Sequence, residues 1–283
     1  MDKKNLVFGR VFTQGNFNNL LNKFSSTEAY FTAAKHIIHD PYSKRNCEII
    51  SEIYAYLKRN YRNEYFYKNT LLNNLLLGVH KPTTTTALTE VRVGKSKADF
   101  VLINGKAVVY EIKTGLDSFE RLLPQVDDYF KAFDHVVVLT DEESKNNLLR
   151  KLGDSPVGVY TLTKRNRISC IRKPVKYSEK LDQEELFKIL HKHEYESIIL
   201  NKFGFLPIVP PVKYYKECRR LFCEIEREEG YSLYLNQLKS RNKIDVNDFD
   251  AIPYELKSLV YFSKYSKSEY SSLNSFLNRK FER

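Results

Sequence analysis

The spacing of hydrophobic and polar residues divides the chain into three consecutive regions. Residues 1–62 carry apolar side chains at helical spacing. Residues 63–174 begin with a helix and continue with short apolar runs that are typical of buried strands. Residues 175–283 return to helical spacing. The pattern predicts an α/β core with a central mixed β-sheet flanked by helices, plus N-terminal and C-terminal helical regions.

The central region predicts one helix followed by three strands. The helix, NEYFYKNTLLNNLLLG, begins at Asn63 and has Glu64 in its first turn. The strands are predicted at Leu88–Val93, Ala98–Ile103 and Ala107–Lys113. The last two are apolar on both alternating faces, so we expect them in the middle of a sheet that is covered on both sides.

The turn between these two strands decides which side chains share a face. A two-residue turn at Asn104-Gly105 would pair Asp99 with Tyr110, and Glu111 would then point the other way. A three-residue loop, or a bulge, pairs Asp99 with Glu111 on one face. Cooperation between the two acids requires one of these latter forms.

A further helix and three more strands follow the hairpin. The helix is predicted from Asp117 or Ser118 through Phe133, with a kink or a restart at Pro124. Gln125 and Tyr129 lie one turn apart on this helix and could act together. The remaining strands are predicted at His135–Thr140, Val157–Thr161 and Arg167–Ile171, with a helix at residues 142–152.

The charge balance bears on the binding partner. The chain has 46 Lys and Arg against 35 Asp and Glu, a net charge of +11. Such a surplus favours polyanions, of which nucleic acid is the commonest. Lys213, Lys216, Arg219 and Arg220 gather on a predicted C-terminal helix, with Tyr234 on the next. This surface is either a nucleic-acid contact or a solvated helical face, and the sequence leaves both open.

Cysteine usage and hydropathy bear on the compartment. The four cysteines form no CxxC pair, so we expect reduced, mostly buried thiols. No apolar run approaches the length of a transmembrane helix. The sequence predicts a soluble cytoplasmic protein without a membrane partner.

Charged residues inside the two apolar strands carry the candidate chemistry. Burial of such charges is costly unless they are paired or bind a metal. Asp99 and Glu111 on one face would repel each other unless a divalent cation lies between them, and the Ile112 carbonyl could add a ligand. Lys113 faces the same way as Glu111 and could stabilise charge on a phosphate. The set predicts metal-assisted hydrolysis of a phosphodiester.

These residues resemble the motifs of the PD-(D/E)XK nuclease superfamily, which has the restriction-endonuclease-like fold. ADF around Asp99 matches its Asp motif, with Ala98 in place of the proline, and Glu111-Ile112-Lys113 matches its (D/E)XK motif. QVDDY, which ends at Tyr129, matches the Gln-x-x-x-Tyr motif of the RecB-like branch. Residues 63–140 also resemble a bacterial family of uncharacterised nucleases found around prophages and mobile islands.

The resemblance implies a role for each matching residue. It implies that Asp99 and Glu111 are metal ligands, that Lys113 is the catalytic lysine, and that Gln125 and Tyr129 support the site or touch the DNA backbone. The superfamily often adds an acid from the helix before the strands. Glu64 fits that place, and Glu90 in the first strand competes with it.

The sequence therefore predicts a Mg²⁺-dependent deoxyribonuclease, with Mn²⁺ as the alternative cofactor. A nucleic-acid-binding module that uses the same fold without turnover is the first competing hypothesis. An RNA or tRNA nuclease is the second competing hypothesis, because the candidate residues would contact phosphate groups, which DNA and RNA share. Defence against phage, counter-defence and maintenance of a mobile element all remain open as biological roles.

Overall fold

The chain forms two compact units. The computed structural model describes residues 3–21, 28–78, 84–241 and 249–282. Residues 1–79 and 244–283 form a helical unit, and residues 80–243 form a unit built on a β-sheet.

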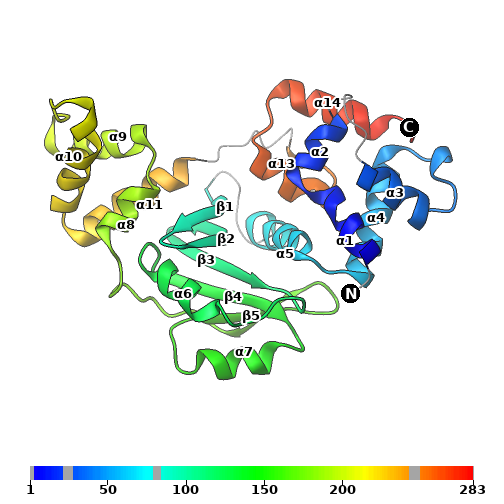
Figure 1. Ribbon diagram of the computed structural model, residues 1–283, viewed down its shortest axis with the longest axis horizontal. Helices are drawn as coiled ribbons and strands as arrows, with labels where there is room; N and C mark the ends of the chain where they lie inside the picture. Colours follow the sequence, from blue (N-terminus) through cyan, green and yellow to red (C-terminus); the bar gives the residue numbers. More distant parts are fainter. Residues whose placement is uncertain (1–2, 22–27, 79–83, 242–248, 283) are drawn as a thin grey trace. The chain divides into compact units, whose positions relative to one another are not determined.

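The helical unit combines both ends of the chain (Figure 1). Its first part contains α1 (Lys3–Gly9), η1 (Arg10–Phe12), α2 (Gln14–Leu21), α3 (Glu28–Ile37), η2 (Pro41–Ser43), α4 (Asn46–Asn60), α5 (Glu64–Leu71) and the π-helical turn η3 (Leu72–Leu77). Its second part contains η4 (Tyr254–Leu256), α13 (Lys257–Ser263) and α14 (Lys267–Asn278).

Buried polar contacts explain why the two ends fold together. Asn46 is buried, accepts a hydrogen bond from the Tyr30 hydroxyl at 2.6 Å, and donates to the Phe276 carbonyl at 3.0 Å. Asn69 likewise donates to the Tyr254 carbonyl at 2.9 Å. A buried amide without such partners would be costly. The units therefore differ from the three consecutive regions expected from the sequence, because long-range contacts of this kind have no local signature.

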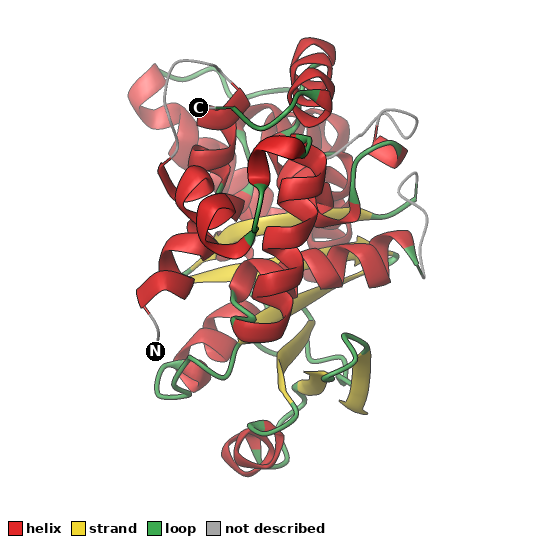
Figure 2. Cartoon of the chain, turned by 90° about the vertical axis from the view of Figure 1, so that its right-hand side faces the viewer, coloured by secondary structure: helices red, strands yellow, loops and turns green. Residues whose placement is uncertain are grey.

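The sheet has six strands in the order β1-β2-β3-β4-β5-β6. The strands are β1 (Thr86–Val93), β2 (Ser96–Asn104), β3 (Lys106–Lys113), β4 (His135–Asp141), β5 (Gly158–Leu162) and β6 (Ile168–Arg172). Neighbours at both ends of the sheet are antiparallel, while β3, β4 and β5 run parallel. The strands rotate relative to one another across the sheet (Figure 2). The expected α/β fold with a mixed sheet flanked by helices is confirmed.

Two crossover helices join the parallel strands. Helix α6 (Leu122–Phe130) connects β3 to β4, and α7 (Lys145–Leu152) connects β4 to β5. Helix α6 begins at Leu122 instead of the predicted Asp117 or Ser118, and it ends at Phe130 instead of Phe133, so both predicted ends were wrong. Thr114 explains the late start, because its N–H and hydroxyl both donate to Asp117 Oδ2, at 2.9 and 2.8 Å. Local bonds of this kind compete with helix formation.

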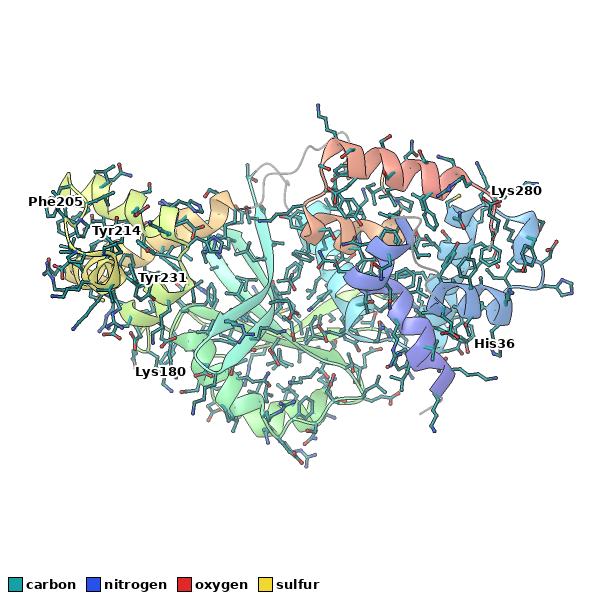
Figure 3. All side chains as sticks on the ribbon, turned by 45° about the horizontal axis from the view of Figure 1, so that its top comes forward. His36, Lys180, Phe205, Tyr214, Tyr231 and Lys280 are labelled. Carbon is teal, nitrogen blue, oxygen red and sulfur yellow. The ribbon has the colours of Figure 1, made fainter. Side chains whose placement is uncertain are left out.

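Four more helices lie in the part of the sheet unit that the structure describes. They are α8 (Gln183–Ile189), α9 (Lys192–Phe203), α10 (Pro211–Glu224) and α11 (Arg227–Ser240). Phe187 and Phe222 are buried in the same core as Val109 and Val138 of the central strands. Figure 3 labels Tyr231 on the side of this helix group toward the strands, and its hydroxyl donates to Asp134 Oδ1 at 2.9 Å.

The observed burial of the cysteines corrects one expectation from the sequence. Of the four cysteines only Cys218 is buried, whereas Cys170 is exposed. The expectation that most of them are buried was therefore wrong.

Among the helices that the structure describes, none is long and apolar enough to span a membrane.

Candidate active site

The β2–β3 hairpin has the register of the three-residue alternative. Ile103 pairs with Ala107, and the ladder continues to its last pair, Phe100 with Tyr110. The next step of this register sets Asp99 opposite Glu111. The two-residue turn is therefore excluded, and the condition for cooperation between the two acids is met.

The two strands separate at the candidate site. Beyond Phe100, β2 continues to Ser96 beside β1, while β3 continues to Lys113 beside β4. Asp99 Oδ2 accepts a hydrogen bond from the Ile112 N–H at 2.8 Å, in place of a backbone partner. The N–H and C=O of one strand residue face the same neighbouring strand, so the Ile112 carbonyl also lies on the side of Asp99.

Glu90 lies opposite Asp99 on the other neighbouring strand. Thr89 pairs with Phe100 and Val91 pairs with Ala98, and Glu90 between them has a left-handed φ of 59°. That conformation is rare for a residue with a side chain. Strained backbone of this kind concentrates at functional sites. The Glu90 and Asp99 carboxylates each place an oxygen within 4.8 Å of the other.

Glu111 is a buried carboxylate with a complete set of partners. It is 1% exposed. Its Oε1 lies 2.9 Å from Lys113 Nζ, and its Oε2 accepts from the Tyr129 hydroxyl at 2.6 Å. Lys113 Nζ also donates to Gln125 Oε1 at 2.9 Å. The ion pair offsets the cost of burying either charge alone.

Helix α6 supplies the other wall of this network. Gln125 and Tyr129 are one turn apart, and both form hydrogen bonds with residues of the (D/E)XK segment. The Tyr129 hydroxyl also lies 2.9 Å from the Lys97 carbonyl oxygen. Burial raises the pKa of Tyr129 well above its usual value, and the nearby charges of Glu111 and Asp99 add to this shift. Tyr129 therefore remains a neutral hydrogen-bond donor.

Glu64 belongs to the helical unit. It is the first residue of α5, and its carboxylate lies 2.6 Å from Lys68 Nζ. The Asn63 side chain caps the same helix by accepting from the Phe66 N–H at 3.2 Å. The role of Glu64 in the site stays a prediction, whereas Glu90 is next to Asp99 within one unit.

The residues around Asp99 are chemically suited to a hard divalent cation. Mg²⁺ prefers oxygen ligands at about 2.1 Å, so two of its ligands lie at most about 4.2 Å apart. Glu90 and Asp99 need at most a small rotation to meet that separation. The side chain of Glu111 would have to leave its partners, Lys113 and Tyr129, before it could bind the same ion.

Two further features differ from what the sequence indicated. Lys97, which pairs with Glu90, was missed, because an exposed lysine in a strand has no distinguishing signal. Tyr234, considered for a nucleic-acid surface, is fully buried, and Arg219 and Arg220 pair with glutamates. That surface is therefore less basic than its sequence indicates.

A second cluster of metal-ligand types lies at the start of α9. His191, His193 and Glu194 bring ligand atoms within 4.8 Å of one another. However, Glu194 is 1% exposed, and both of its oxygens accept from Arg241, at 2.7 and 2.6 Å. This cluster is explained by a buried ion pair and a helix cap.

Fold and residues together describe an α/β protein with a mixed six-stranded sheet and a group of acids at the point where β2 leaves β3. The chain belongs to the family described as bacteriophage P4 protein cII, whose model matches residues 57–252. The matched stretch includes every candidate residue from Glu64 to Tyr129. Comparisons with curated proteins and with solved structures find no match.

Proposed function

We propose that this protein is a Mg²⁺-dependent nuclease that hydrolyses phosphodiester bonds in DNA. The observation that carries the proposal is the gathering of Asp99, Glu111 and Lys113 where β2 and β3 separate, with Glu90 beside Asp99. Membership of a bacteriophage P4 family supports an association with mobile genetic elements. The net charge of +11 supports a polyanionic substrate.

The carboxylates divide into an accessible pair and a buried one. Glu90 and Asp99 would hold the cation, with the Ile112 carbonyl as a further ligand. Glu111 would join them once it leaves Lys113 and Tyr129. When bound, Mg²⁺ or Mn²⁺ would acidify water and offset negative charge on the phosphate.

Lys113 has the position that the proposed chemistry requires. Its ammonium lies between Glu111 and Gln125, at 2.9 Å from an oxygen of each. An ammonium held in advance by two acceptors needs little reorganisation to donate to a phosphate oxygen as negative charge develops there. Before the cation binds, Tyr129 fixes Glu111 and thereby keeps the lysine in place, and Gln125 would still hold the lysine after Glu111 moves.

Cleavage of plasmid and linear DNA with Mg²⁺ tests the proposal. We expect Asp99→Asn and Lys113→Met each to lower the rate by about 100-fold or more. Asp154→Asn and Lys151→Met are matched controls, because both residues are exposed at the end of α7. Circular dichroism checks folding, and calorimetry with Mn²⁺ should show weakened binding only for Asp99→Asn. Undiminished cleavage by both site variants would exclude the proposed site.

A binding module without turnover is the second candidate function. The observation that favours it is the 1% exposure of Glu111, both of whose oxygens already have partners. Nucleic-acid binding that is insensitive to divalent cations, without cleavage of DNA or RNA, would establish this alternative. Cleavage of RNA with DNA left intact would instead reassign the substrate while preserving the site.

A further inference from the structure

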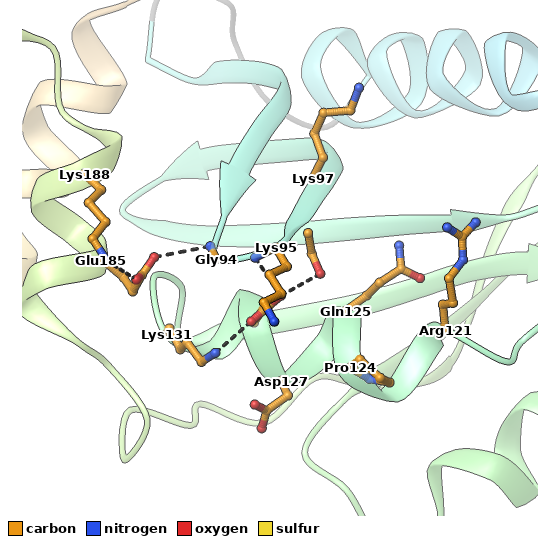
Figure 4. Close-up of a pocket in the computed structure, with 12 residues that line it drawn as sticks. Gly94, Lys95, Lys97, Arg121, Pro124, Gln125, Asp127, Lys131, Glu185 and Lys188 are labelled. Atoms are coloured by element: carbon orange, nitrogen blue, oxygen red, sulfur yellow. Dashed lines mark hydrogen bonds and ion pairs between the residues drawn. The ribbon is translucent and has the colours of Figure 1, made fainter.

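An open cavity adjoins the candidate site within the sheet unit (Figure 4). Its volume is about 950 Å³, and its walls are the β1–β2 turn, the start of α6 and one side of α8. Lys97 and Gln125 line it. The Lys97 carbonyl contacts Tyr129, and Gln125 accepts from Lys113. The cavity therefore meets the site through two of its own residues.

The β1–β2 turn that forms one wall is held from two sides. Asp128 on α6 accepts from the Lys95 N–H at 3.1 Å and from the Ser96 hydroxyl at 2.8 Å. Glu185 on α8 accepts from the Gly94 N–H at 3.2 Å. Burial would raise the pKa of Asp128, but hydrogen bonds from Lys131, Ser96 and Lys95 outweigh it and lower the pKa. The turn is thus preorganised before anything binds.

The charges around the cavity are unevenly matched. Each acid in its lining already has a lysine partner: Asp127 pairs with Lys180, Asp128 with Lys131, and Glu185 with Lys188. Lys95 and Arg121 are both exposed, and in the described part of the chain neither has a carboxylate at ion-pair distance. Lys95 and Arg121 therefore give the cavity lining two positive charges that its acids do not balance.

These two cations flank the entrance to the site. Arg121 immediately precedes α6, one turn before Gln125. Figure 4 shows Gln125 between Lys95 and Arg121, with the side chains of Gln125 and Arg121 projecting in the same direction. A ligand with one negative charge would leave part of this positive charge unbalanced. A backbone with repeated phosphates could meet both while one phosphodiester lies at Lys113.

We propose that this cavity holds the backbone of one strand of the nucleic-acid substrate, with Lys95 and Arg121 as its phosphate contacts. This assignment rests on the proposed function and deepens it, since it names the residues that hold the substrate. Lys95 binds from the β1–β2 turn and Arg121 from the start of α6. Contacts to phosphate position a strand without reading its sequence.

Binding of fluorescent oligonucleotides in Asp99→Asn protein, which is not expected to cleave them, tests the assignment. We add Lys95→Glu or Arg121→Glu and measure anisotropy over a range of NaCl concentrations. Each reversal should weaken binding about tenfold at about 0.1 M salt, and should reduce the slope of log K against log[salt] by about 1. Lys151→Glu on α7 makes the same change in net charge and should leave the slope unchanged.

The outcomes separate this assignment from the proposed function. Slopes for Lys95→Glu and Arg121→Glu equal to that of Lys151→Glu would overturn the cavity assignment, even if the unsubstituted protein cleaves DNA. Displacement of the oligonucleotide by polyglutamate at equal charge concentration would also overturn it, in favour of an acidic protein partner. Full cleavage by Asp99→Asn would overturn the proposed site, while the slopes would still report on the cavity.

Discussion

Glu90 shows how a single residue can mark the site. Its φ of 59° costs about 1–2 kcal/mol relative to an ordinary strand conformation. Glycine would remove that cost, yet a glutamate stands there, with its carboxylate beside Asp99 and paired with Lys97. We infer that the strained backbone is retained because it directs the carboxylate toward Asp99.

Two substitutions at this position separate strain from charge. Glu90→Gly and Glu90→Ala both remove the carboxylate and the ion pair, but only glycine relieves the left-handed backbone. We expect Glu90→Gly to be more stable than Glu90→Ala by about 1 kcal/mol, after allowance for the greater freedom of glycine in the unfolded chain. Urea denaturation measures the difference, and calorimetry with Mn²⁺ should show both variants equally weakened. A Glu90→Gly variant that is less stable than Glu90→Ala would mean that the backbone of Glu90 is unstrained in solution.

Some site residues could be found from the sequence, while others could not. Asp99, Glu111 and Lys113 are visible because charges inside apolar strands require an explanation. Gln125 and Tyr129 were indicated by the resemblance to the Gln-x-x-x-Tyr motif, whereas their spacing on a helix showed only that they could act together. The strain at Glu90 and the role of Lys97 depend on a local irregularity between β1 and β2, and no composition or periodicity encodes it.

At the scale of elements, the strands were predictable and the connection to α6 was not. The runs that form β2 and β3 are apolar on both faces, so their type and approximate bounds follow from the sequence. The hairpin register remained open between two turns, and the structure has the longer one. The start of α6 was misplaced because Asp117 binds Thr114 instead of capping a helix.

The β1–β2 turn offers a test of how tightly the elements are coupled. A Cβ added to Gly94 would lie 2.6 Å from Asp128 Oδ1, and the φ of Gly94 is +57°. Gly94→Ala therefore combines backbone strain with displacement of Asp128 from Lys95 and Ser96.

Gly105→Ala is the matched variant, because Gly105 also has a positive φ but has open space around its Cα. We expect Gly94→Ala to cost about 1–2 kcal/mol more than Gly105→Ala, from the weakened hydrogen bonds of Asp128. Chemical denaturation of both variants measures this. A cost no larger than that of Gly105→Ala would show that Asp128 moves without loss.

At the scale of the whole molecule, tyrosine and phenylalanine supply the large buried side chains. The chain has 20 Tyr and no Trp. Tyr30 and Tyr54 in the helical unit, and Tyr231 and Tyr234 in the sheet unit, are buried, and burial raises the pKa of each above its usual value of 10. The division into two units could not be predicted from the sequence. The use of tyrosine and phenylalanine as large packing side chains could be predicted, because the chain has no Trp.

The raised pKa values link stability to alkaline pH with a definite sign. A buried tyrosine whose folded pKa exceeds its unfolded value contributes stability that is fully present below about pH 10. Above that pH the unfolded chain ionises while the folded chain does not. Each such tyrosine then lowers the free energy of unfolding by up to about 1.4 kcal/mol per pH unit. Both units should therefore lose stability steeply above pH 10.

Tyr234→Phe and Tyr231→Phe form a pair that tests this link. The Tyr234 hydroxyl is buried without a hydrogen-bond partner among the described residues, so its removal should be neutral or stabilising near pH 7. Tyr231→Phe loses two contacts to Asp134 and should cost about 1–3 kcal/mol at the same pH. Urea denaturation from pH 7 to pH 11 should show a shallower alkaline decline for both variants than for the unsubstituted protein. An unchanged decline in both would mean that these phenols ionise in the folded state, contrary to their burial.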